Sequence, residues 1–277
     1  MPLWYTFFMN DIIDFTCLQK GKNLYSNKKH SHGKSYEFVL VCGGSGSFIV
    51  KDKIFPLKPS CLYCIDGLET HCSSPENPTV YERHILVVKA DFIDKLIELT
   101  NCTKAKEHLF ADGGKCLQLS DDTLTKLSRL FYEIKNSIWA NDGFAKAKIV
   151  SAILFIFEHA FKQSNTVSPF IDGYVASAIE YINENLSFDI RLDDICKAIS
   201  LSKYHLCRLF KKDVGMTITD YVLSLRLSKA KKELLYTKKP ISTISLDTGF
   251  PDFSYFCKVF KLHEGVTPSQ FRNGIIL

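Results

Sequence analysis

The second half of the chain places apolar residues with the period of amphipathic helices, interrupted by short breaks. Ser202 follows one such break and is a typical N-cap, and Gly215 is a typical C-terminal stop. A helix is therefore predicted from about Lys203 to Val214, after a shorter helix that begins at Leu192. A short helix, a tight turn and a second amphipathic helix make a helix-turn-helix. The apolar positions are Leu192, Ile195 and Ile199, then Leu206, Leu209 and Phe210.

The same pattern occurs twice. Residues 206–211 (LCRLFK) recur as residues 256–261 (FCKVFK), and the same shift of fifty carries Gly215 onto Gly265 and Thr217 onto Thr267. Two copies are too few for a solenoid, which needs about three repeats to bury a core. The repeat therefore predicts two helix-turn-helix units in one chain.

In the second copy, Gly249 supplies the turn, and either Asp252 or Ser254 can cap a helix that runs to about residue 263. Thr267 followed by Pro268 is typical of the start of a closing helix. Residues 217–236 join the copies, and twenty helical residues span roughly 30 Å. One turn of DNA is roughly 34–36 Å. One chain could thus place helices 203–214 and 253–263 in successive major grooves.

Charge supports a nucleic-acid partner. The whole chain carries a formal net charge of +5, from 35 Lys or Arg and 30 Asp or Glu. Residues 197–261 alone hold thirteen Lys or Arg and five Asp or Glu. The basic excess therefore lies in the repeated region, as neutralisation of phosphate requires.

Residues 171–277 resemble the DNA-binding domain of the AraC/XylS family of bacterial transcription regulators. The resemblance implies base-facing positions at Tyr204, Cys207 and Arg208 in the first copy and at Phe253, Ser254 and Lys258 in the second, with Lys211 and Lys261 nearer phosphate. The sequence departs from the family at Ser245 and Pro251, and Pro251 could change how the second unit approaches DNA. The matching positions are Leu192 to Ile195, Ser202, Leu206, Arg208, Phe210, Lys211, Gly215, Tyr221, Arg226, Leu227, Ala230, Leu234, Leu235, Ile241, Ile244, Gly249, Phe250, Asp252, Ser254, Tyr255, Phe256, Phe260, Lys261, Gly265, Thr267, Pro268, Phe271 and Arg272.

The first part of the chain has a different pattern, in which short apolar runs alternate with turn signals. Strands are predicted at residues 36–41, 47–50, 54–55, 61–65 and 80–88. Such strands indicate a β-barrel or sandwich. Residues 121–139 and 144–161 then predict two amphipathic helices, whose apolar stripes need a partner surface in their own barrel or in a second subunit. The polar residues 163–169 are the candidate linker between domains 1–165 and 171–277.

Residues 28–90 resemble, more loosely, the cupin-type sensor domain that precedes many such DNA-binding domains. His30, His32 and Glu37 match the spacing of the first cupin metal motif, and His71 lies near the second, although the flanking glycines do not fit. An organic effector pocket is one interpretation of His30, His32, Tyr36, Glu37 and His71, and structural or surface histidines are another. We predict no metal and no cofactor. In related regulators the helical region dimerises, which predicts a homodimer through residues 121–161.

The fold class expected is thus two-domain, with a cupin-like β-barrel and helical pair followed by an all-α domain of two helix-turn-helix units. No apolar run approaches the ~20 residues that a membrane helix needs, and Met1 to Tyr5 lack the basic start of a signal peptide. We expect a bacterial cytoplasmic protein, nucleoid-associated when bound, with reduced cysteines.

The function expected is that of an effector-responsive transcription regulator, not an enzyme, that binds promoter DNA. The resemblance to the family further implies that the protein activates transcription and contacts RNA polymerase. Two alternatives stay open. One is a metal-dependent cupin enzyme tethered to DNA, with His30, His32, Glu37 and His71 as ligands. The other is a constitutive regulator whose barrel only dimerises.

Overall fold

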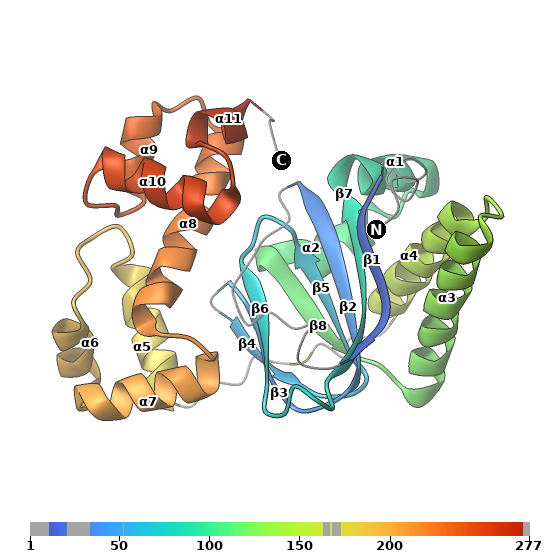
Figure 1. Ribbon diagram of the computed structural model, residues 1–277, viewed down its shortest axis with the longest axis horizontal. Coiled ribbons are helices and arrows are strands. Elements are labelled where there is room, and N and C mark those ends of the chain that lie inside the picture. The colour runs from blue at the N-terminus through green and yellow to red at the C-terminus, as the bar shows by residue number, and fades with distance from the viewer. Residues whose placement is uncertain (1–10, 21–33, 52, 163–166, 168–172, 274–277) are drawn as a thin grey trace. The chain divides into compact units, whose positions relative to one another are not determined.

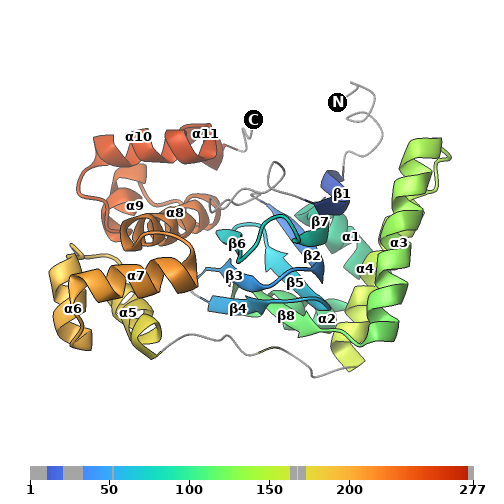
Figure 2. The same cartoon turned by 60° about the horizontal axis from the view of Figure 1, so that its bottom comes forward.

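The structure, a computed structural model, describes residues 11–20, 34–51, 53–162, 167 and 173–273. These residues divide into two compact units, one built from the β-sheets and helices α1 to α4, the other from helices α5 to α11. The domain limits 1–165 and 171–277 stay predictions. Figures 1 and 2 show the elements of each unit.

The first unit contains two antiparallel sheets. In the described residues, the larger sheet has the strand order β1-β7-β2-β5-β8 and the smaller one the order β4-β3-β6. The strands are β1 (Ile12–Lys20), β2 (Ser35–Gly43), β3 (Gly46–Val50), β4 (Lys53–Leu57), β5 (Cys61–Asp66), β6 (His71–Pro75), β7 (Glu82–Lys89) and β8 (Gly114–Gln118).

The central strands of the larger sheet are apolar on both faces. In β2, Phe38 and Leu40 belong to the core that lies toward the helices, whereas Val39 and Val41 belong to the core shared with Phe48 and Phe55 of the smaller sheet. Because successive side chains of a strand point to opposite faces, one continuous apolar run serves two cores. The larger sheet is therefore the middle layer of the unit.

The prediction of a β-barrel is wrong for the described residues, in which the strands form two sheets and do not close on one another. A closed barrel encloses a single interior, but here apolar residues on both faces of β2, β5 and β7 need cover on two sides. The smaller sheet covers one face, and α1 to α4 cover the other (Figures 1 and 2).

Helices α1 (Ala90–Thr100) and α2 (Thr103–Phe110) and a 3₁₀ turn (Ala111–Gly113) precede β8, and α3 (Asp121–Ala140) and α4 (Ala145–Lys162) follow it. The helix pair was predicted at residues 121–139 and 144–161. Ser120 caps α3 by accepting a hydrogen bond from the Thr123 N–H, and Asn141 ends it in the left-handed conformation. Phe131 of α3 stacks on Phe15 of β1 with ring centroids 5.8 Å apart. The apolar stripes of both helices therefore pack into their own unit.

The second unit contains two helix-turn-helix units joined by a long helix, as predicted. Helix α8 runs from the group of helices around α7 to the group around α10 (Figure 1). The helices are α5 (Gly173–Glu184), α6 (Leu192–Ile199), α7 (Lys203–Val214), α8 (Ile218–Tyr236), α9 (Ile241–Asp247), α10 (Phe253–Glu264) and α11 (Pro268–Arg272).

Side-chain caps set the starts of the main helices in this unit. Ser202 accepts a hydrogen bond from the His205 N–H, and Thr217 accepts one from the Asp220 N–H. Asp252, and not Ser254, caps α10. Thr267 and Gln270 form a reciprocal capping box with Pro268 at the first helical position.

The two copies adopt matching geometry. Phe210 meets Tyr221 edge-to-face at 5.3 Å, and their repeat partners Phe260 and Phe271 meet at 5.4 Å in the same arrangement. The helix ends also match, because Gly215 has φ 75° and Gly265 has φ 78°. The internal repeat in the sequence is therefore a repeat in structure. No helix in the described part of the chain has both the length and the apolarity needed to span a bilayer.

Candidate nucleic-acid interface

Helix α7 presents a polar face opposite its buried face. Leu206, Phe210 and Val214 are buried, and all three lie on the core side of the helix. Tyr204 is 81% exposed, and Arg208 and Lys211 are also exposed. Because positions three and four apart share one face of a helix, these three side chains form one outward stripe, with exposed Cys207 beside it.

Lys203, at the first position of α7, has an ion-pair partner within the unit. Its Nζ lies 2.6 Å from the Asp193 carboxylate in the first turn of α6. The hydrogen bond that Lys203 donates to this carboxylate raises the pKa of Lys203. Lys203 therefore links α7 to α6, and Arg208 is the first basic residue of the outward stripe.

Helix α10 repeats the arrangement with different chemistry. Phe256, Val259 and Phe260 are buried, and Ser254, Lys258 and Lys261 form the outward stripe. Phe253 and Tyr255 are each 45% exposed beside this stripe, whereas Cys257 is half-buried against the core. Lys258 and Lys261 of α10 thus stand where α7 has Arg208 and Lys211. The first turn of α10 also carries two aromatic rings beside the stripe.

Arg226 of α8 binds the loop that leads into the first copy. Its Nε donates to the Leu186 carbonyl oxygen at 3.1 Å, and its Nη2 donates to the Phe188 carbonyl oxygen at 2.6 Å. Partial burial lowers the pKa of Arg226. Both carbonyls lie in the loop between α5 and α6, so this arginine has a structural task.

A second set of contacts joins the same loop to the second copy. Lys229 Nζ donates to Ser187 Oγ at 3.0 Å and to the Asp247 carbonyl oxygen at 3.2 Å, and Ser187 Oγ donates to that same oxygen at 2.8 Å. Gly249 packs so closely here that a Cβ would collide with the Leu186 carbonyl oxygen. We call these contacts of Leu186, Ser187, Arg226, Lys229, Asp247 and Gly249 the inter-copy contact.

A buried ion pair fixes α10 against α8. Lys231 has no exposed surface, and its Nζ lies 3.0 Å from the Glu264 carboxylate at the end of α10. Separating such a pair leaves one charge buried without compensation, which is costly. Together with the inter-copy contact, this pair fixes both outward stripes on one rigid body.

The charge pattern of the sequence does not distinguish structural from exposed basic residues. Lys203, Arg226, Lys229 and Lys231 contribute to the local charge excess, yet each has a partner within the unit. Arg226 could have been suspected, since the matching pattern places it in the centre of the long helix. The residues named for DNA contact, Tyr204, Cys207, Arg208, Lys211, Phe253, Ser254, Lys258 and Lys261, all lie on α7 or α10, and Cys207 is one of the exposed ones.

In the first unit, the structure joins two of the five predicted effector residues. His71 Nε2 lies 2.6 Å from Glu37 Oε2, and His71 Nδ1 lies 3.1 Å from the Glu69 carbonyl oxygen. Because a carbonyl oxygen only accepts hydrogen bonds, Nδ1 is the donor in the second contact, and Nε2 is the ring nitrogen that faces the Glu37 carboxyl group. Both side chains are buried between the two sheets.

The other three predicted effector residues do not join this pair. Tyr36 lies on the opposite face of β2, with its ring 4.2 Å from the ring of Phe110. His30 and His32 lie outside the described residues. Among the residues that the structure does describe, no group of three or more His, Cys, Asp or Glu side chains is placed to hold a metal ion.

Polar residues that the sequence analysis missed lie on the same side of the larger sheet as Glu37. Arg83 of β7 donates to Ser73 Oγ at 2.9 Å and to the Tyr81 hydroxyl at 3.3 Å. Burial raises the pKa of Tyr81. Strand alternation places Arg83 on the face of Ile85 and Val87, so its position was predictable once the strand was assigned.

Comparison with known proteins finds one family model and a set of similar regulators. A family model described as a helix-turn-helix domain matches residues 195–274. The chain is 36% identical over 104 residues to the regulatory protein PocR of Salmonella typhimurium, covering 38% of this chain and 34% of that protein. It is 34% identical over 114 residues to the arabinose operon regulatory protein of Escherichia coli, covering 40% and 38%.

Some relatives match along most of the chain. An example is the lactose operon transcription activator of Staphylococcus xylosus, 23% identical over 241 residues, with 84% of this chain and 82% of that protein covered. In contrast, the chain spans little more than a third of the length of PocR and of the arabinose regulator.

Proposed function

Because the chain belongs to the AraC/XylS family of helix-turn-helix regulators, we propose that it is a sequence-specific DNA-binding transcription regulator that responds to a small-molecule effector. The observation that carries this proposal is the pair of matched outward stripes on α7 and α10, held on one body by the inter-copy contact and the Lys231–Glu264 pair. A rigid pair of reading helices suits two successive major grooves of one duplex.

The two reading helices have different roles in this proposal. Arg208 is the main base reader, since a guanidinium can bind guanine O6 and N7 together. Tyr204, Cys207, Phe253, Ser254 and Lys258 face bases beside it, and Lys211 and Lys261 neutralise phosphates. The lysines of α10 are point charges and discriminate less well between bases. We therefore assign most of the sequence specificity to α7.

The proposal is tested by selecting binding sites for the full chain from a random DNA pool. The expected result is one asymmetric site that covers two successive major grooves and is more strictly defined in the half bound by α7. Recovery of DNA without any common sequence would contradict a specific regulator. Recovery of a palindromic site would show that two chains each use one reading helix.

The response to an effector, activation and contact with RNA polymerase belong to the same proposal, which places the protein in the bacterial cytoplasm. An effector stabilises the state that it binds, so a thermal-shift screen with sugars, aromatic acids and lipids tests the response. Activation is tested by transcription in vitro from a promoter that carries the selected site. Reduced transcription on addition of the protein would identify a repressor instead.

Dimerisation through residues 121–161 also remains a proposal. Since α3 and α4 bury their apolar stripes in their own unit, a dimer has to use the outer sides of these helices, where Phe155 is only partly buried. Sedimentation of the full chain at high concentration tests this. A single monomeric species would remove dimerisation from the proposal without affecting the two reading helices.

A further inference from the structure

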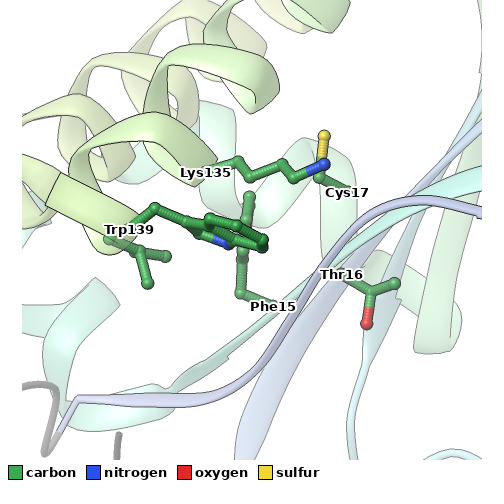
Figure 3. A pocket seen from close by; sticks show the side chains of 6 residues that line it. Phe15, Thr16, Cys17, Lys135 and Trp139 are labelled. Atoms are coloured by element: carbon green, nitrogen blue, oxygen red, sulfur yellow. The ribbon is translucent and has the colours of Figure 1, made fainter.

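A pocket of about 180 Å³ lies in the first unit between the edge strand β1 and helix α3. It is on the helix side of the larger sheet, whereas Glu37 and His71 lie on the other side. In Figure 3, Lys135 and Trp139 extend from α3 toward the side chains of β1. The lining residues are Phe15, Thr16, Cys17, Lys135, Ile138 and Trp139.

The walls of the pocket suit a flat apolar group. Phe15 and Ile138 line it from β1 and α3, and the indole of Trp139 lies at its mouth with 80% of its surface exposed. An exposed tryptophan beside a pocket is unusual for a side chain whose ordinary place is a core. A cavity of roughly 150 Å³ holds one benzene molecule, so this pocket has room for a single ring or a short alkyl chain.

One charge lies in the pocket. Lys135 Nζ is 5.8 Å from the centroid of the Trp139 ring. Burial raises the pKa of the Cys17 thiol, and the charge of Lys135 partly opposes this effect. With the residues that the structure describes, Lys135 forms no ion pair. A lone ammonium beside apolar walls is an attractive partner for a carboxylate.

A second polar group lies behind the pocket. His84 of β7 is fully buried, and its Nδ1 accepts a hydrogen bond of 3.1 Å from the backbone N–H of Leu18. Nε2 therefore carries the hydrogen, and within the described residues it has no acceptor. Lys135 is close enough to His84 to contribute to the low pKa of the imidazole. The Nε2–H of His84 is thus a buried donor without an acceptor among the described residues, and it lies within the electrostatic influence of the Lys135 ammonium.

The backbone at this place is also unusual. The pairing of β1 with β7 is irregular between Thr16 and Gln19, and Leu18 has φ 52°, which is rare for a leucine. This conformation turns the Leu18 N–H toward His84. Bulges and strained residues concentrate where a strand presents side chains for binding.

We propose that this pocket binds a small amphipathic carboxylate, whose apolar body lies between Phe15 and Trp139 and whose carboxylate accepts hydrogen bonds from Lys135. Such a ligand links the bulge of β1 to α3 and so stabilises the edge of the sheet. Binding itself does not depend on the regulatory role, and only the consequence for DNA binding rests on the proposed function.

The test uses the full chain with Trp4→Phe, which leaves Trp139 as the one tryptophan of the two in the sequence. Benzoate is titrated while the emission of Trp139 is recorded, and benzyl alcohol serves as the uncharged analogue of equal size. We expect a saturable change with benzoate and at least tenfold weaker binding of benzyl alcohol, since hydrogen bonds to a charged group are the stronger ones.

Substitutions on α3 then assign the charge. Lys135→Met should weaken benzoate binding about tenfold, and Lys135→Arg should retain it. Lys126→Met is the matched control, because Lys126 is on the same helix but pairs with Asp122 in solvent, away from the pocket. Its affinity for benzoate should stay unchanged. Circular dichroism confirms that each variant is folded.

Absence of saturable benzoate binding, equal affinity for benzoate and benzyl alcohol, or equal loss in Lys135→Met and Lys126→Met would each overturn the proposal. An emission of Trp139 that depends on protein concentration and not on benzoate would show that a second copy of the chain occupies the pocket. Binding of the selected DNA is measured separately, so failure here leaves the proposed function standing, and failure there leaves this pocket standing.

Discussion

The two reading helices, α7 and α10, have the same shape and differ in a few side chains. Arg208 on α7 corresponds to Lys258 on α10, and Lys211 corresponds to Lys261. A planar guanidinium offers two parallel donors, whereas an ammonium offers a single charge that any phosphate or acceptor can satisfy. The difference between one arginine and one lysine therefore predicts which half of the site is read strictly.

Arg208→Ala should cost roughly 1–3 kcal/mol in binding to the selected site and should relax the base preference at one position. Lys261→Ala should weaken binding to all sequences alike and lower the salt dependence by about one counterion. Both effects follow from titrations of selected and random DNA at several salt concentrations. Equal losses on selected and random DNA in both variants would remove the distinction between base reader and phosphate contact.

His84 makes the first unit sensitive to acid. Burial lowers its pKa to about 4, and the charge of Lys135 adds to the effect. In the unfolded chain an ordinary histidine takes up its proton near pH 6.5, so the unfolded state binds more protons as the pH falls from about 6.5 to about 4. Its contribution to stability is complete above that range and is lost on acidification, on the order of 3 kcal/mol.

This contribution is measured by unfolding the full chain with Trp4→Phe in denaturant between pH 7 and pH 4, with the emission of Trp139 as the signal. In His84→Gln, the amide oxygen can still accept from the Leu18 N–H, but the side chain does not titrate. The difference in stability between the two proteins should therefore shrink as the pH falls. A constant difference over this range would show that His84 is not the group responsible.

At the scale of elements, local signals in the sequence predicted the helices well. Ser202, Gly215 and Thr267 start or end helices as predicted, because capping depends on residues within one turn. The strands β1, β6 and β8 were missed. In β1 the irregular pairing around Leu18 interrupts the alternation that identifies a strand, and β8 is a five-residue strand that begins at a glycine.

Some features of the candidate site could be predicted from the sequence, and others could not. The repeat placed Arg208 and Lys258 on outward faces, since the apolar positions of a helix fix where the others point. Pairing with distant residues could not be predicted. Lys231 meets Glu264 and Lys229 meets Ser187 only because of the folded arrangement of α8. The pocket beside Lys135 could not be predicted either. One of its walls is β1, and the alternation of apolar and polar residues did not indicate that strand.

Gly249 offers a test of the inter-copy contact at this scale. Gly249→Ala should destabilise the second unit by more than the roughly 1–3 kcal/mol that a positive φ costs, because its Cβ also collides with Leu186 and Arg226. Gly265→Ala is the matched control, since Gly265 has a similar φ but open space around the Cβ position. Thermal unfolding measures both, and equal losses would show that the close approach has no energetic weight.

At the scale of the whole molecule, the described structure gives the second unit a fixed geometry. Helix α8 has 19 residues, which corresponds to a length of about 28 Å. Polar contacts attach both copies to this helix, through Arg226 on one side and Lys231 on the other. Two binding units on a flexible tether could adapt to different spacings, but two units on one rigid body cannot. The spacing of the two half-sites in DNA is therefore predicted to be invariant.

Inserting five base pairs between the halves of the selected site should lower affinity about a hundredfold or more, because the second reading helix then faces the wrong side of the duplex. Inserting ten should lower it equally, since a rigid unit cannot reach a groove one turn further away. Gel-shift titrations of the three DNAs measure this. Recovery of affinity with ten added base pairs would indicate a flexible connection and contradict the rigid unit.

The inter-copy contact also has a consequence for how such a chain can evolve. A duplicated unit is usually free to be exchanged by recombination with its counterpart in another gene. Here the loop before the first copy is bonded to the long helix and to the turn of the second copy, through Ser187, Lys229 and Asp247. A crossover within residues 188–248 would separate partners that fit one another. We therefore expect the two copies to be inherited together, and, on the proposed function, a new DNA specificity to arise by substitution on the outward stripes.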